Sequence, residues 1–112
     1  MKKIEAIIRP ESVDAVRNAL SDAGVTGLMI SEIEGHGKQK GVVQQWRGEK
    51  YKVELLPKAK IEIIVKDQDV GKIGKVIIDS AKTGEIGDGK IFIYPVDEVI
   101  RIRTGEKGEG AV

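Results

Sequence analysis

Residues 2–24, KKIEAIIRPESVDAVRNALSDAG, give the clearest indication of the fold. The first half of this stretch places Ile4, Ala6 and Ile8 on one alternating face and is interrupted at Pro10, which is typical of a β-strand. Its second half has apolar residues at helical spacing and ends at Gly24, which predicts an α-helix closed by glycine. Ser12 is the expected N-cap of this helix. The apolar stripe consists of Val13, Val16, Ala19, Leu20 and Ala23.

The same strand–helix order returns in residues 59–81. AKIEIIVK alternates as a strand, and the helix that follows has Asp67 as its expected cap and contains Gly71 and Gly74. Further strands are predicted within residues 25–35 and 90–96, and a short fifth within 98–104. The resulting order β-α-β-β-α-β predicts an α+β, ferredoxin-like sandwich with both helices on one face of the sheet. The apolar stripe of the second predicted helix, the one that follows Asp67, consists of Val70, Ile73, Val76, Ile77 and Ala81.

The open face of this sheet is predicted to be apolar. Ile7, Ile64 and Ile93 are expected to alternate away from the helices. A single domain cannot cover such a face, so we expect a homo-oligomer in which the sheets of several copies pack on each other.

Size, charge and composition narrow the class of protein. The 112 residues fit a single domain, 1–112, and the formal net charge of +1 gives no general attraction to nucleic acid or to a membrane. The chain has no cysteine and no long apolar run, and a cytoplasmic location is expected. RNA-recognition domains share the predicted strand order, but Phe92 and Tyr94 are too few aromatic residues for base stacking.

The segment between the second and third predicted strands is unusually long. Residues 35–58 far exceed the roughly 2–5 residues of an ordinary hairpin connection. Because this segment also carries Trp46 and Tyr51, a recognition loop is favoured over a long connection without a function. The glycine-rich, charged tail 105–112 is expected to be mobile.

Three clusters suit the binding of a polyphosphate. Glycines surround residues 38–40, glycines lead into Lys90, and Arg101 and Arg103 alternate in the predicted last strand. Glycines let backbone N–H groups encircle an anion, and Lys or Arg supplies the opposite charge. Each cluster alone is also what an ordinary turn or solvated strand contains. Residues 84–90 approach a Walker phosphate loop, but Ile91 stands where that motif has Ser or Thr, and Asp88 is expected to hold the turn.

The residues argue against an enzyme. With a single histidine, His36, no Ser-His-Asp arrangement or histidine metal site can be assembled. A phosphotransferase or slow ATPase is the alternative, but no nucleophile or good general base is evident. Glu62 could accept hydrogen bonds from a ribose diol or simply pair with a lysine.

Four stretches together resemble the PII nitrogen-regulatory signal-transduction proteins, especially those associated with ammonium transporters. The likeness runs from Met1 to about Gly105. The stretches are GHGKQKG at 35–41, LPKAKIEI at 56–63, TGEIGDGKIF at 83–92 and VIRIRTGE at 99–106.

The resemblance implies a trimer of ferredoxin-like subunits with ATP or ADP bound in the clefts between them. The loop 83–90 would cradle the phosphates, the base of the long loop would approach from the other side, and two arginines would reach across from the neighbouring subunit. The nucleotide-binding positions implied are Ile7, Gly27, Met29, Gly35, Gly37, Lys38, Gln39, Glu62, Ile64, Gly87, Asp88, Gly89, Lys90, Arg101 and Arg103.

The resemblance also implies a second effector, 2-oxoglutarate, which joins MgATP. Gln39 would be a ligand of Mg²⁺, and Lys58 would pair with the distal carboxylate. The long regulatory loop would carry the response to a partner. Arg47 at its tip would enter an ammonium transporter, the favoured target, with glutamine synthetase second and recruitment to the membrane as a consequence. The implied 2-oxoglutarate positions are Gly37, Gln39, Lys40, Gly41 and Lys58.

The chain departs from the family's usual residues at several of these places. Met29 replaces a common threonine, and Lys38 replaces a frequent arginine, which loses bidentate geometry. Tyr51, the residue that the family modifies, is retained in an altered surround, and residues 42–45 differ as well. Nucleotide preference, uridylylation and partner choice therefore do not transfer directly.

Overall fold

The computed structural model describes residues 1–36, 43–46, 49–52 and 55–112. These residues form two α-helices and six β-strands, four of which lie between the helices in sequence, and short 3-10 turns lie at Pro10–Ser12, Asp67–Asp69 and Glu109–Ala111. The elements are β1 (Lys2–Ile8), α1 (Val13–Asp22), β2 (Met29–His36), β3 (Val43–Trp46), β4 (Glu49–Lys52), β5 (Leu55–Val65), α2 (Val70–Ala81) and β6 (Gly89–Pro95).

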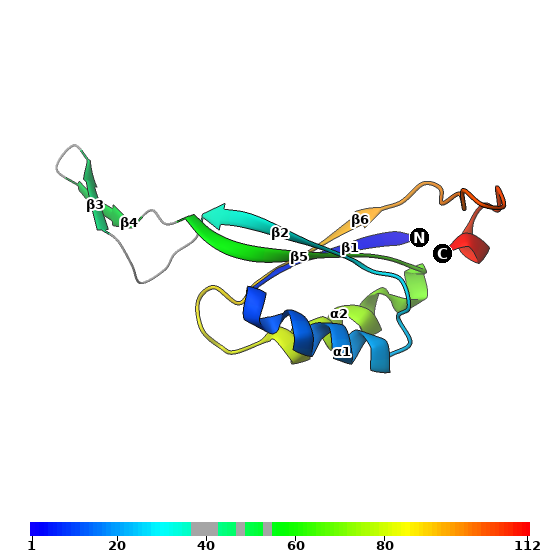
Figure 1. Ribbon diagram of the computed structural model, residues 1–112, viewed down its shortest axis with the longest axis horizontal. Coiled ribbons are helices and arrows are strands. Elements are labelled where there is room, and N and C mark those ends of the chain that lie inside the picture. Colours follow the sequence, from blue (N-terminus) through cyan, green and yellow to red (C-terminus); the bar gives the residue numbers. More distant parts are fainter. Residues whose placement is uncertain (37–42, 47–48, 53–54) are drawn as a thin grey trace.

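The main sheet has the strand order β2-β5-β1-β6, and all of its neighbouring strands are antiparallel. Both helices lie on the same face of this sheet and leave the other face open (Figure 1). This arrangement confirms the predicted α+β, ferredoxin-like sandwich.

The core lies between the helices and the central strands β1 and β5. Ile4 in β1 and Ile61 in β5 are completely buried, as are Val16 and Leu20 in α1. Each such aliphatic side chain contributes about 1.5–3 kcal/mol by leaving water. The remaining buried residues share the same faces: Ala6, Ile8, Ala59, Ile63, Val65, Ile73, Ile77 and Ala81.

The helices begin differently from the prediction. Ser12 stands at the expected N-cap position of α1, but its side chain makes no capping hydrogen bond. Asp67 was expected to cap α2, but it lies in the 3-10 turn before that helix, whose N-cap position is taken by Asp69 without a side-chain hydrogen bond. Asp67 instead accepts the amino group of Met1 at 2.8 Å. This ion pair joins the start of β1 to the turn before α2 and lowers the pKa of Asp67. Gly24 closes α1 as predicted, with a φ of 91°.

The open face contains different apolar residues from those predicted. Ile93 pairs with the buried Ile4 and therefore lies on the helix side, so its expected position was wrong. Phe92 lies on the open face instead, because it pairs with Glu5. Ile7 and Ile64 do face away from the helices, since their neighbours along β1 and β5 are buried.

Strand pairing extends into both ends of the segment 35–58. Gly35 is paired with Leu56 and His36 with Leu55, so these residues continue the β2–β5 ladder. Within the segment, β3 and β4 form a separate two-stranded sheet beyond the end of the main sheet (Figure 1).

The predicted fifth strand does not form. Within this range Ile100 forms an isolated bridge to Lys107, and residues 102–104 form a turn between the two bridge partners. Arg101 and Arg103 therefore do not share a strand face, which corrects the sequence-based expectation.

Candidate functional site

Residues 82–88 join α2 to β6, and this loop contains two glycines with positive φ, Gly84 and Gly87. A third, Gly89, begins the strand. Gly89 shows why glycine is needed, because its φ is 111° and an added β-carbon would lie 1.7 Å from the carbonyl oxygen of Ile7. The loop thus follows a helix and opens a strand, unlike a Walker loop, which opens a helix.

Asp88 holds this loop in shape. Its carboxylate accepts the backbone N–H groups of Thr83 and Gly84, both at 2.9 Å, and also the hydroxyl of Thr83. The hydrogen bonds from Thr83 lower the pKa of Asp88 to about 2, with smaller contributions from Gly84 and Arg9. The expectation that Asp88 fixes the turn is confirmed.

Arg9, which sequence reasoning did not select, also contacts the loop. Its guanidinium donates to the carbonyl oxygen of Ile86 at 2.9 Å and to Asp88 at 3.4 Å. Arg9 directly follows β1, whose last residue, Ile8, pairs with Gly89. No local pattern could reveal this contact, because Arg9 and Ile86 are 77 residues apart.

Lys58 reaches the same loop from β5. Its ammonium group donates to the carbonyl oxygen of Gly87 at 3.0 Å. Within the described part of the chain, no hydrogen bond uses the backbone N–H groups of Gly87 or Asp88. These two N–H groups can therefore donate hydrogen bonds to an anion, and the ammonium group of Lys58 lies beside them.

The open sheet face continues the site away from the loop. Lys90 pairs with Ile7, so these two residues lie side by side in β6 and β1. Two residues along the strands, Glu62 in β5 pairs with Met29 in β2. Because strands rise by about 3.3 Å per residue, Glu62 lies roughly 7 Å along the sheet from the level of Ile7.

Glu62 belongs to a ring of polar contacts on this face. It accepts a hydrogen bond from the ammonium group of Lys3 at 3.3 Å, and the ammonium group of Lys60 lies 3.8 Å from Glu62 and 3.6 Å from Glu5. Tyr94 donates to Glu5 at 2.6 Å and has Lys3 over its ring. This hydrogen bond lowers the pKa of Glu5 and raises that of Tyr94. Of the two alternatives considered for Glu62, the pairing with a lysine is present.

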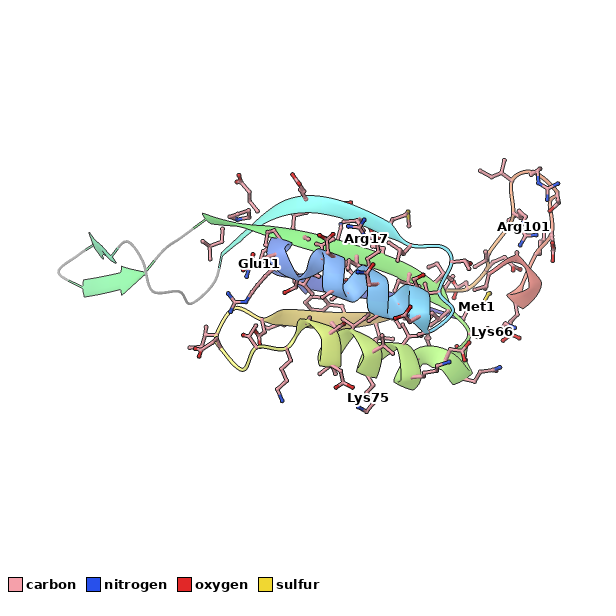
Figure 2. All side chains as sticks on the ribbon, turned by 60° about the horizontal axis from the view of Figure 1, so that its bottom comes forward. Met1, Glu11, Arg17, Lys66, Lys75 and Arg101 are labelled. Carbon is pink, nitrogen blue, oxygen red and sulfur yellow. The ribbon has the colours of Figure 1, made fainter. Side chains whose placement is uncertain are left out.

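The remaining predicted residues lie at the other end of the molecule. Gly27 and Ile64 line a pocket of about 280 Å³ that also includes the C-terminal Val112. Arg101 donates to Glu106 at 3.0 Å and to Gly110 at 3.4 Å, and it stands far from the loop between α2 and β6 (Figure 2). One chain therefore presents two separate groups of predicted site residues.

Several predicted residues lie outside the described residues. The positions concerned are Gly37, Lys38, Gln39, Lys40, Gly41 and Arg47. Tyr51 lies within β4, opposite Gln44.

Two further properties concern the described ranges alone. In residues 1–36, 43–46, 49–52 and 55–112, no three His, Asp or Glu side chains gather as a metal site. Neither α1 nor α2 is long enough to cross a bilayer.

Comparison with known proteins places the chain in a family. Residues 1–106 match the family model described as Nitrogen regulatory protein P-II. The chain is 55% identical to Nitrogen regulatory protein P-II 2 of Methanothermobacter thermautotrophicus, over 100% of this chain and 97% of that protein. It is 56% identical to Nitrogen regulatory protein P-II of Nostoc punctiforme and 52% identical to Nitrogen regulatory protein P-II 1 of Escherichia coli, over the full length of both chains in each case.

The agreement covers all the elements that build the site. The matched residues, 1–106, include the sheet, both helices, the loop after α2 and Arg101. Proteins of this family are signal-transduction regulators of nitrogen metabolism rather than enzymes. The chain belongs to the nitrogen regulatory protein P-II family.

Proposed function

We propose that this P-II protein binds ATP or ADP, senses 2-oxoglutarate together with MgATP, and controls an ammonium transporter through its long loop. The observation that carries the proposal is the loop that joins α2 to β6. Its shape is set by Asp88, two of its backbone N–H groups are not used within the described structure, and Lys58 and Lys90 border it. Such an arrangement suits the phosphates of a nucleotide.

The rest of the nucleotide would lie between two copies of the chain. Ile7 and Lys90 are at the loop end of the open face, whereas Ile64, Gly27 and Arg101 are toward the other end. A ligand that uses both groups therefore requires a second copy to supply one of them. The exposed apolar residues of the open face favour the same assembly, a homotrimer as in the resemblance.

Glu62 and Met29 would lie beside the sugar and base. The carboxylate of Glu62 can accept a ribose hydroxyl, while the thioether of Met29 offers a polarizable surface but no hydroxyl. Met29 is 58% exposed in the single chain, so it is available to a ligand or to a neighbouring copy.

The proposed effector 2-oxoglutarate would use the ammonium group of Lys58. Gln39 would be a ligand of Mg²⁺ together with oxygens of ATP and of the effector, as hard cations prefer. Affinity for 2-oxoglutarate should then depend on MgATP, and the dependence should be reciprocal. Residues 37–41 would complete this site.

The long loop would transmit the bound state to the partner. Arg47 would enter the pore of an ammonium transporter, because a planar guanidinium can form several directed hydrogen bonds. Glutamine synthetase is the second candidate target.

Isothermal titration calorimetry tests the sensing function. ATP, ADP and 2-oxoglutarate are titrated separately, and then 2-oxoglutarate is titrated in the presence of MgATP. We expect 2-oxoglutarate to bind only when MgATP is present, and equal binding without it would refute the coupling.

A binding assay with the purified transporter tests the target. Arg47→Ala is expected to abolish association while ATP binding stays as in the wild type. Intact association of that variant would rule out the pore-blocking role.

A further inference from the structure

Arg9 lies just after β1 and holds two points of the loop that joins α2 to β6. Its side chain is 22% exposed, and that of Asp88 is 24% exposed. The shorter contact, 2.9 Å, goes to the carbonyl oxygen of Ile86, and the longer one, 3.4 Å, goes to the carboxylate of Asp88. One guanidinium thus bridges the middle of the loop and its end.

We propose that Arg9 is a positioning residue for phosphate binding, which fixes the loop in the conformation that receives a nucleotide's phosphates. The inference rests on the proposed function. Arg9 would act through Asp88 and Ile86 without touching the nucleotide itself.

The first physical reason is geometric. Asp88 already closes residues 83–88 on themselves through Thr83 and Gly84, but these contacts do not join the loop to the sheet. Lys58 joins the loop to β5 at Gly87, and Arg9 adds a second connection at Ile86 and Asp88, since it follows a strand that is paired on both sides. A loop whose N–H groups are held in advance loses less entropy when a ligand binds.

The second reason is electrostatic. Asp88 lies within the loop that would receive a polyphosphate, and its pKa of about 2 keeps it negatively charged near neutral pH. An uncompensated carboxylate at this point would repel phosphates. The guanidinium of Arg9 offsets that charge. Removing the guanidinium should therefore weaken the binding of a ligand more strongly when its phosphate groups carry more charge.

Titration calorimetry of Arg9 variants tests the inference, with ATP, ADP and adenosine as probes at one salt concentration. Arg9→Gln is expected to weaken ATP binding on the order of tenfold, ADP binding less, and adenosine binding not measurably. Arg9→Lys should restore part of the loss, because it keeps the charge and one donor. In an Asp88→Asn background, Arg9→Gln should have a much smaller further effect, since the charge that it offsets is gone.

Amide hydrogen exchange gives a readout that needs no ligand. In Arg9→Gln the amides of residues 84–88 are expected to exchange faster, while those of β5 keep their protection. If Arg9→Gln does not fold, Arg9→Lys supplies the same comparison with one of the two contacts weakened.

The outcomes separate this inference from the proposed function. If the wild type binds ATP and Arg9→Gln binds it equally well, the positioning role is wrong while nucleotide sensing stands. If the losses of Arg9→Gln and Asp88→Asn simply add, Arg9 contacts the ligand directly and the inference is overturned. If the wild type binds no adenine nucleotide, the proposed function fails, and the positioning role for phosphate binding fails with it.

Discussion

The ammonium group of Lys58 lies 3.0 Å from the carbonyl oxygen of Gly87. This contact joins β5 to the loop that precedes β6, across 29 residues of sequence. Lys58 is also the residue proposed to pair with the distal carboxylate of 2-oxoglutarate. One ammonium group therefore connects the two proposed effector sites, which gives a physical route by which each ligand can affect the other.

Replacing Lys58 should affect nucleotide binding even without 2-oxoglutarate. Lys58→Met removes the donor to Gly87 and keeps most of the side-chain length, so we expect ATP affinity to fall by about threefold. Binding of 2-oxoglutarate in the presence of MgATP should be lost. Calorimetry measures both effects, and Lys75→Met, whose ammonium pairs with Asp79 on α2, is the control. A variant that loses 2-oxoglutarate but binds ATP normally would show that the Gly87 contact does not couple the sites.

Gly89 should tolerate substitution far less than Gly84. Both have positive φ, but a β-carbon at Gly84 meets nothing within 4 Å, whereas one at Gly89 would overlap the backbone of Ile7. Gly84→Ala is expected to lower the free energy of unfolding by about 1 kcal/mol and Gly89→Ala by more than about 3 kcal/mol. Urea denaturation followed by circular dichroism compares the two. Equal losses would mean that the close approach to Ile7 relaxes easily.

Asp88 should contribute to acid stability in a defined pH range. Its pKa falls from an ordinary value of 3.8 to about 2 in the folded chain, because of its hydrogen bonds with Thr83. A depressed pKa gives stabilisation that is present above pH 3.8 and is lost as the pH falls through about 2. Asp88→Asn removes this contribution.

The urea midpoint, measured between pH 5 and pH 2, checks the role of Asp88. The wild type should lose more stability over this range than Asp88→Asn does. Parallel curves would contradict it, because Glu5 and Asp67, whose pKa values are also lowered, are unchanged in both proteins.

The turn after residue 100 should take part in assembly. Ile102 is completely exposed in the single chain, so Ile102→Asp should leave the subunit's own packing intact. If neighbouring copies cover Ile102, the substitution buries a carboxylate at a cost of about 2 kcal/mol or more and shifts the oligomer toward monomer.

Sedimentation velocity over a range of concentrations tests the role of Ile102. Ile78→Asp is the matched control, because Ile78 is exposed on α2, on the helix side of the sheet. Wild-type sedimentation of Ile102→Asp would place residue 102 outside the interface.

Local structure and the class of fold follow from patterns among near neighbours in the chain. Alternation in residues 2–8 and 59–65 and helical spacing in residues 13–23 and 70–81 depend on neighbours a few positions away, so single-chain patterns suffice to predict them. The turn-forming role of Asp88 was also predictable, because its partners Thr83 and Gly84 lie within five residues.

Contacts between distant residues depend on how the folded chain packs. Strand register placed Phe92 rather than Ile93 on the open face, and the amino group of Met1 took Asp67 as a partner in place of a helix cap. The contact between Arg9 and the loop carries no sequence signal, because it depends on the β1–β6 ladder bringing Ile8 beside Gly89. Periodicity reports on the face that a residue occupies, whereas long-range contacts follow from the register of paired strands and the reach of long side chains.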